Sequence, residues 1–299
     1  MGRRWVLLAL AVAALGGPAA WAVPRQAVDD LGTEVGLSAP PQRIVSLAPS
    51  NTELLFALGL GSWVVGVTSY CDYPPAAARV ARVAGFSDLS VETIAAVQPD
   101  LVLASRGNDP EGLRAVAELG VPVFAIDVQT VAQLMEAITR VGYLTWREAA
   151  AAALRDSLEA RVEAVVARCP AGRRPRVMWG SFADPIFTAG AGTLIDDVIR
   201  LAGGENLGAR APGAWPQISL ETIVAWQPEV FISSLMEPGQ PPESRLEALR
   251  QMDGWRAVPA VRHGRVHYVD GDLLNRPGPR IVEALERVAE LVHPAVGQD

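Results

Sequence analysis

One segment of this chain occurs twice, and the two copies limit the fold more than any other feature. Residues 90–105 and 219–234 are identical at 8 of 16 positions, at an offset of 129 residues. In each copy a serine precedes about two turns of helix, a Gln-Pro pair ends the helix, and an acidic residue leads into an apolar strand. The repeat therefore predicts two similar lobes with a cleft between them.

Strands alternate with helices around both copies, which is typical of parallel sheets covered by helices. We expect a hairpin over 26–37, and then a first lobe with strands 43–47, 64–68, 100–104 and 121–126. Ser50 and Glu53 have the spacing of a capping box that opens a helix over 52–58. In the second lobe we expect strands 176–180, 229–233 and 266–270, and helices 193–201, 243–252 and 280–293. The fold class is thus α/β, with a central, mainly parallel sheet in each lobe.

Residues 145–169 contain neither glycine nor proline and are rich in Ala, Leu, Arg and Glu, which predicts a single long helix. At 1.5 Å per residue, a helix of 20 residues would span about 30 Å, the width of a lobe. Two interpretations stay open: a rigid connector between the lobes, or an amphipathic helix packed on one of them. We expect an N-terminal lobe over 23–144 and a C-terminal lobe over 170–299.

The first 22 residues have the features of a cleavable signal peptide. Arg3 and Arg4 precede an apolar run over 5–15, and Ala20-Trp21-Ala22 provides a cleavage site. The run is too short for a bilayer span of about 20 residues, and no later stretch approaches that length. No cysteine follows the run, so we expect no lipid anchor. We expect export to a periplasm and no membrane-embedded part.

Charge and cysteine content narrow the choice of partners. The formal net charge is −7, and it becomes −9 without Arg3 and Arg4. This acidity argues against nucleic acid or an anionic membrane as the main partner, and it favours a basic docking partner. The spacing of Cys71 and Cys169 is that of neither a disulfide framework nor a metal knuckle. A single disulfide bond between them in an oxidising compartment stays open.

Common catalytic motifs are missing from the sequence. It has no H-E-x-x-H, G-x-S-x-G, P-loop, C-x-x-C or dinucleotide fingerprint. His263 and His267 lie four apart in a predicted strand, and no third ligand is nearby, which favours a structural role over zinc binding. We expect no catalytic residues, no metal and no cofactor. An exported hydrolase is the alternative from another class of protein.

Four aromatic residues fall in predicted loops at strand ends: Tyr70, Phe86, Phe187 and Trp215. Open α/β sheets bind ligands outside the carboxyl ends of their strands. Rings at that edge suit a large, flat ligand. The alternative for each ring is that it packs beneath its own loop.

Four runs of the chain are informative as a set: Arg43–Glu53, Tyr70–Pro74, Trp215–Gln217 and Arg276–Arg280. They resemble the periplasmic binding proteins that carry cobalamin, haem and ferric siderophores to ABC importers, and most of all the vitamin B12-binding branch. The resemblance covers essentially the whole mature chain. It implies two lobes, a rigid interdomain helix at 145–169 and a shallow cleft that opens little.

The resemblance also implies the ligand contacts, and it places the four aromatic residues around a corrinoid, with Asp272 and Arg276 as polar contacts. The vitamin B12-binding branch has tryptophans where this chain has Phe86 and Ser105, so one ring is smaller and one is absent. Ser105, Arg106, Gly107 and Asn108 would offer hydrogen bonds to corrin amides, although they also suit other ligands. Haem with Tyr70 as axial ligand, and a ferric siderophore held by Arg106 and Arg276, are the alternatives.

The family docks on a permease dimer, driven by cytoplasmic ATPases, through a glutamate on each lobe. These glutamates map onto Glu92 and Glu221, one in each repeat copy. A carboxylate in a first helical turn also stabilises its helix by about 0.3–1 kcal/mol without any partner. Both roles are compatible, since matched carboxylates on two lobes suit two basic pockets of a two-fold symmetric permease. We expect the binding protein itself to be a monomer.

Overall fold

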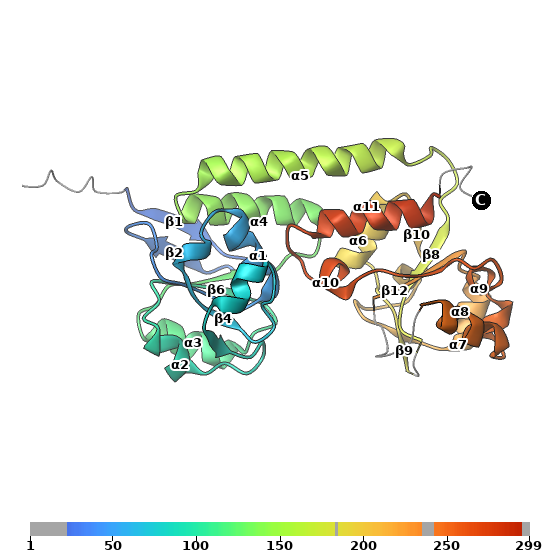
Figure 1. The fold of residues 1–299 in the computed structure, drawn as a ribbon, viewed down its shortest axis with the longest axis horizontal. Coiled ribbons are helices and arrows are strands. Elements are labelled where there is room, and N and C mark those ends of the chain that lie inside the picture. Colours follow the sequence, from blue (N-terminus) through green and yellow to red (C-terminus); the bar gives the residue numbers. More distant parts are fainter. Residues whose placement is uncertain (1–22, 183–184, 235–241, 295–299) are drawn as a thin grey trace, which may run out of the picture.

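The computed structural model describes residues 23–182, 185–234 and 242–294, and it contains two α/β lobes that lie side by side (Figure 1). The predicted signal peptide, residues 1–22, lies outside this part of the chain. Among the described residues, no helix combines the length and the apolar character that crossing a bilayer requires.

The N-terminal lobe is built on a five-stranded parallel sheet with the order β5-β4-β3-β6-β7. Its strands are β3 (Ile44–Ser46), β4 (Val64–Thr68), β5 (Arg82–Ala84), β6 (Leu101–Ser105) and β7 (Val123–Ile126). Alternate side chains of these strands face opposite layers of helices. Helices α1 (Pro49–Ala57) and α4 (Val131–Leu144) cover one face, and α2 (Val91–Ala96) and α3 (Pro110–Glu118) cover the other. The predicted hairpin precedes the lobe as antiparallel β1 (Arg25–Val28) and β2 (Glu34–Leu37).

The C-terminal lobe has a four-stranded parallel sheet with the order β10-β8-β12-β13. These strands are β8 (Arg176–Trp179), β10 (Glu205–Asn206), β12 (Val230–Ser233) and β13 (Val266–Tyr268). A small antiparallel pair, β9 (Ile186–Phe187) and β11 (Gln217–Ile218), projects from the lobe. One face of the sheet packs on α6 (Leu194–Leu201) and α11 (Ile281–Val292). The other packs on α7 (Leu220–Trp226), α8 (Pro242–Gln251) and α9 (Pro259–Arg262), while α10 (Gly271–Leu274) follows β13.

Helix α5 (Glu148–Arg168) bridges the lobes along one side of the molecule (Figure 1). It packs on α4 of the N-terminal lobe and on α11 of the C-terminal lobe. Gly142 of α4 allows a close approach, because a Cβ there would lie 2.2 Å from the Cβ of Ala151. Contact with both lobes favours the connector over a helix packed on one lobe. The buried side chains recur every seven residues along one stripe: Ala151, Leu158 and Val165.

The repeat copies share their hydrogen bonds as well as their sequence. The Ser90 hydroxyl accepts the backbone N–H of Thr93 at 3.3 Å, and the Ser219 hydroxyl accepts that of Thr222 at 3.3 Å. The helix of each copy ends before a glutamine with positive φ, 45° at Gln98 and 55° at Gln227. The predicted caps and stops are thus confirmed in both lobes.

Two predicted helix starts are wrong. The long helix begins at Glu148 and not at Thr145, because Trp146 has a φ of 56° and separates α5 from α4 by a turn. The capping box at Ser50 does not form. Helix α1 starts at Pro49, its N-cap Ala48 has no side-chain hydrogen bond, and Glu53 is buried and bonded elsewhere.

Candidate ligand-binding cleft

A cavity of about 660 Å³ opens between the lobes at the carboxyl ends of the N-terminal strands. Loops after β4, β5 and β6 line one side, and residues 275–277 of the C-terminal lobe line the other. Of the predicted contacts, the cavity brings together Tyr70, Phe86, Ser105 and Arg276. A ligand here would touch both lobes at once.

The N-terminal wall carries two aromatic rings on loops that are held in different ways. Tyr70 follows β4 and is 61% exposed. The ring of Phe86 lies on Gly107, since a Cβ at that glycine would be 2.7 Å from a ring carbon. The Asn108 amide donates to the carbonyl oxygens of Leu47 and Phe86, at 2.9 and 2.6 Å. Asn108 is therefore buried as a brace for the wall, and the prediction that it offers hydrogen bonds to a ligand is wrong.

Two more exposed rings of the C-terminal lobe lie on or beside the small β9–β11 pair, in which Phe187 lies opposite Gln217. Phe187 is 44% exposed and Trp215 is 56% exposed. The Trp215 ring meets buried Trp179 edge-on, with centroids 5.8 Å apart and planes at 67°. Neither exposed ring lines the 660 Å³ cavity itself.

Charged residues of the two lobes meet beside the cavity. Arg276 bonds Asp72 of the N-terminal lobe at 2.6 Å and its own neighbour Asp272 at 2.7 Å. Arg280 donates to both oxygens of Glu53, at 2.6 and 3.0 Å. Asp272 and Arg276 thus neutralise each other, and four of these five groups tie one lobe to the other.

This cluster shifts the pKa values of its carboxyl groups in opposite directions. Burial raises the pKa of Glu53 above its usual value, although the hydrogen bond and charge of Arg280 oppose the rise. The hydrogen bond from Arg276 lowers the pKa of Asp72, which is more exposed. Asp72 therefore remains ionised throughout the neutral range.

Sequence reasoning missed Glu53, Asp72 and Arg280 as interlobe partners, and it missed Asn275 in the cavity wall. The four-residue spacing of Arg276 and Arg280 was visible, but their carboxylate partners on the N-terminal lobe lie more than 200 residues away. Arg106, by contrast, is exposed and pairs with Asp127 outside the cavity, so the structure does not gather it with the predicted contacts.

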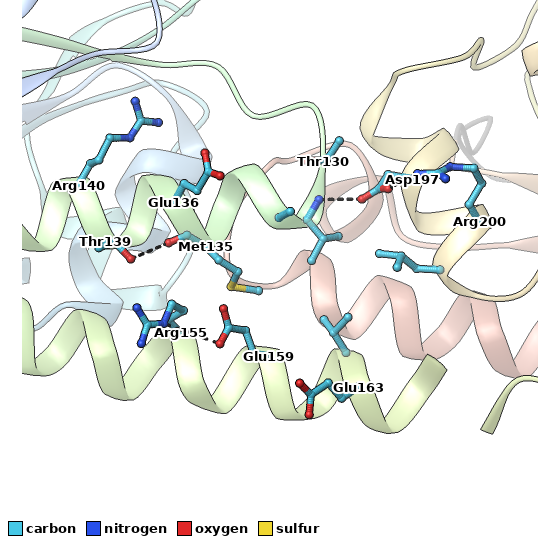
Figure 2. Close-up of a pocket in the computed structure, with 14 residues that line it drawn as sticks. Thr130, Met135, Glu136, Thr139, Arg140, Arg155, Glu159, Glu163, Asp197 and Arg200 are labelled. Carbon is cyan, nitrogen blue, oxygen red and sulfur yellow. Dashed lines mark hydrogen bonds and ion pairs between the residues drawn. The ribbon is translucent and has the colours of Figure 1, made fainter. Parts of the chain in front are cut away.

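A larger cavity of about 1110 Å³ lies between α4 of the N-terminal lobe, α5 and α6 of the C-terminal lobe (Figure 2). There the Asp197 carboxylate accepts the backbone N–H of Val131 at 2.9 Å, and so joins α6 to the start of α4. None of the described residues that line this cavity is aromatic. The cleft with Tyr70 and Phe86 is therefore the better candidate for binding a flat ligand, despite its smaller volume.

Glu92 and Glu221 are both exposed and lie in the first turns of α2 and α7. These helices lie on the side of the molecule opposite α5 (Figure 1). A hydrogen bond with Ser219 lowers the pKa of Glu221, which keeps it charged. The two matched carboxylates thus face solvent on one side of a two-lobed body.

The cysteines and histidines form no ligand set. Cys71 and Cys169 are both free, so the possible bond between them is absent. His267 lies in β13, but His263 ends α9, so the prediction that both occupy one strand is wrong. Across the described ranges, no group of three His, Cys, Asp or Glu residues is arranged to hold a metal ion.

Comparison with known proteins decides the family. A family model described as periplasmic binding protein matches residues 44–273. An ABC transporter substrate-binding lipoprotein of Bacillus subtilis (strain 168) is 31% identical over 276 residues, or 89% of this chain and 85% of that protein. The chain belongs to the periplasmic binding protein family. The resemblance drawn from the sequence is confirmed.

Two solved structures agree with the two-lobed fold. The periplasmic vitamin B12-binding protein of Vibrio cholerae has a TM-score of 0.74 and 29% identity, covering 85% of this chain and 97% of that chain. A periplasmic heme-binding protein from Roseiflexus sp. RS-1, in apo form, has a TM-score of 0.73 and 28% identity, covering 84% and 97%. The predicted α/β fold class is confirmed, and the family members to which the chain is similar are binding proteins rather than enzymes.

Proposed function

We propose that this chain is the exported substrate-binding subunit of an ABC importer and that it captures cobalamin or a related corrinoid. The observation that carries the proposal is the set of exposed aromatic rings on both lobes. Tyr70 projects from one lobe, Phe187 and Trp215 project from the other, and all three are more than 40% exposed. Exposed rings on two lobes that together enclose a cavity favour a broad apolar partner.

Affinity in this proposal comes from burying a flat macrocycle against the rings, while polar groups orient its periphery. Phe86 and Ser105 supply the cavity wall, and the paired Asp272 and Arg276 supply its charged border. The chain itself catalyses nothing and needs no cofactor. The similarity to a vitamin B12-binding protein supports the corrinoid, and the relatives give no support to an exported hydrolase.

Haem is the second candidate, because one cavity residue suits it. Tyr70 is exposed, and a phenolate there could serve as an axial iron ligand. The similarity to a heme-binding protein supports the same alternative. A ferric siderophore has less support, since Arg276 is already paired with two carboxylates and Arg106 with Asp127.

One titration separates these ligands. Purified protein is titrated with cyanocobalamin, hemin and a ferric siderophore, while tryptophan emission and the visible spectrum are recorded. We expect saturable quenching with cyanocobalamin that Tyr70→Ala weakens and Tyr143→Ala does not, because Tyr143 is also exposed but lies on α4. A Soret shift with hemin that is lost in Tyr70→Phe, without any response to cyanocobalamin, would reject the corrinoid.

We further propose that residues 1–22 direct export to the periplasm and that Glu92 and Glu221 dock on basic pockets of the permease. Uptake by cells is the measurement. Glu92→Ala combined with Glu221→Ala should abolish uptake and leave the Kd for ligand unchanged. Glu118→Ala combined with Glu163→Ala removes two other exposed carboxylates and should leave uptake intact. Loss of ligand affinity in the first pair would instead assign these residues to the fold or the cleft.

A further inference from the structure

A chain of hydrogen bonds runs from the interior of the C-terminal lobe to the cleft. Trp179, at the end of β8, is buried, and its indole Nε1–H donates to the Ser234 hydroxyl at 3.0 Å. Ser234 directly follows β12 and is 5% exposed. Its hydroxyl in turn donates to the side-chain carbonyl oxygen of Asn275 at 3.0 Å. Asn275 lines the same cavity as Tyr70 and Phe86.

The polarity of this chain is fixed at its buried end. An indole N–H can only donate, so Ser234 must accept from Trp179 and has one hydrogen left to give. With the Asn275 amide reversed, that hydrogen would need another acceptor in a buried site, and leaving it unpaired is costly. The amide oxygen of Asn275 therefore faces Ser234, an orientation that follows from the network rather than from the shape of the side chain.

The other half of the amide is available to a ligand. No described residue accepts a hydrogen bond from the Asn275 NH2 group, and the residue is exposed. Gly271 leaves room for it, because a Cβ at that position would lie 3.2 Å from the amide nitrogen and 2.9 Å from the Ser234 carbonyl oxygen. The cleft thus presents two N–H donors whose direction is set from beneath.

Trp179 also packs against an exposed ring of the C-terminal lobe. Its ring packs edge-on against Trp215, which is 56% exposed. The backbone carbonyl of Trp179 accepts the Thr188 hydroxyl at 2.6 Å, and Thr188 directly follows β9. One buried residue therefore positions both a polar group of the cavity and an exposed ring of the C-terminal lobe.

We propose that Trp179 and Ser234 are positioning residues, and that they orient Asn275 to bind a carbonyl or carboxylate oxygen on the periphery of a flat ligand. This inference rests on the proposed function, since it concerns the same cleft. Both candidate ligand classes carry such oxygens, as amides on a corrin and as carboxylates on haem. The oriented donors select for an acceptor at this point of the rim.

A double-mutant cycle in Kd tests the relay, with cyanocobalamin and hemin as probes. Ser234→Ala and Asn275→Ala should each weaken binding about fivefold. Because they act through one hydrogen bond to the ligand, the double variant should be no weaker than Asn275→Ala alone. Tyr70→Ala combined with Ser234→Ala is the control, and its effects should multiply since they concern opposite lobes. Multiplying effects for Ser234 and Asn275 would overturn the relay.

Asn275→Asp separates the two ligand sources. The variant replaces the donors by a negative charge, so hemin should lose more affinity than cyanocobalamin, whose peripheral amides are neutral. An increase in affinity for either probe would contradict a donor role for Asn275.

A measurement without ligand keeps this inference distinguishable from the proposed function. In protein labelled with ¹⁵N-tryptophan, the Trp179 indole signal is assigned by its loss in Trp179→Phe. Its N–H exchange with solvent should accelerate about tenfold or more in Ser234→Ala, and by a smaller factor in Asn275→Ala. Unchanged exchange in both variants would refute the relay, whatever the protein binds. Faster exchange without binding of any probe would instead reject the proposed ligands alone.

Discussion

The two lobes are alike where they hold themselves together and different where they face the cleft. In both sheets, a central strand has the strand of the repeat copy on one side and another strand on the other side. In the N-terminal lobe β3 lies between the repeat strand β6 and β4, and in the C-terminal lobe β8 lies between the repeat strand β12 and β10. The walls differ. The N-terminal lobe lines the cavity with loops that directly follow its strands, whereas the C-terminal lobe lines it with residues 275–277, which follow helix α10. Short-range hydrogen bonds preserve the scaffold, while most of the residues that line the cavity lie outside the two repeat copies.

The largest test of this comparison concerns the matched core isoleucines. Ile94 and Ile223 are both 0% exposed. Each lies in the apolar core on the side of its sheet that α2 or α7 covers. Ile94→Ala and Ile223→Ala should each lower the free energy of unfolding by about 2–5 kcal/mol in chemical denaturation. Exposed Ala96→Ser and Ala225→Ser, at matched positions of the same helices, should change it by less than about 0.5 kcal/mol. If one of the two isoleucine substitutions leaves the free energy of unfolding nearly unchanged, the two copies pack differently.

The next test concerns the acidic residue of each copy. Asp100 accepts the backbone N–H groups of Gln42 and Arg43, at 2.7 and 2.9 Å, and so fixes the start of β3. Glu229 accepts that of Arg176 at 3.0 Å at the start of β8. Substitution of either by alanine removes these acceptors, and we expect a loss of about 1–3 kcal/mol in unfolding free energy. Asp100→Asn retains an acceptor oxygen and should lose less unfolding free energy than Asp100→Ala. Equal losses in the two variants would show that the charge of Asp100, and not its acceptor oxygens, causes the effect.

Smaller effects are expected at the serine caps. Ser90→Ala and Ser219→Ala should each cost about 1 kcal/mol, since each removes the acceptor for one backbone N–H in the first turn. Ser90→Gly and Ser219→Gly should cost only a few tenths. Thermal unfolding measures both pairs. If only one lobe responds, the shared hydrogen bond does not carry equal weight in the two copies.

The smallest effect is a pH dependence in the C-terminal lobe. Burial acts to raise the pKa of Glu229, but hydrogen bonds from the Arg176 backbone and from Arg173 hold this pKa below its usual value. A lowered pKa gives stability that is present above the ordinary value of 4.5 and is lost as the pH falls through the folded-state pKa. The stability difference between the wild-type chain and Glu229→Gln should therefore be larger at pH 7 than at pH 3. A difference independent of pH would contradict this.

Local features of the fold were readable from the sequence because their causes lie within a few residues. The caps at Ser90 and Ser219, the Gln-Pro stops and the alternation of strands with helices all depend on neighbours in the chain. The predicted strands of both lobes formed, most within two residues of their expected ends. The short strands β5, β9, β10 and β11 were not predicted, since their pairing depends on partners elsewhere in the chain.

Sequence alone thus determined two copies of an α/β lobe, the long helix between them and the aromatic residues placed after strands. Only the tertiary structure decided which of these rings share a cavity, and that Glu53 binds Arg280 instead of capping its own helix. It also decided that Asn275 receives its orientation from Trp179 through Ser234. The physical reason is the same in each case. A cap is a contact across three residues, whereas these contacts join residues 41 to 227 positions apart, and no local pattern records them.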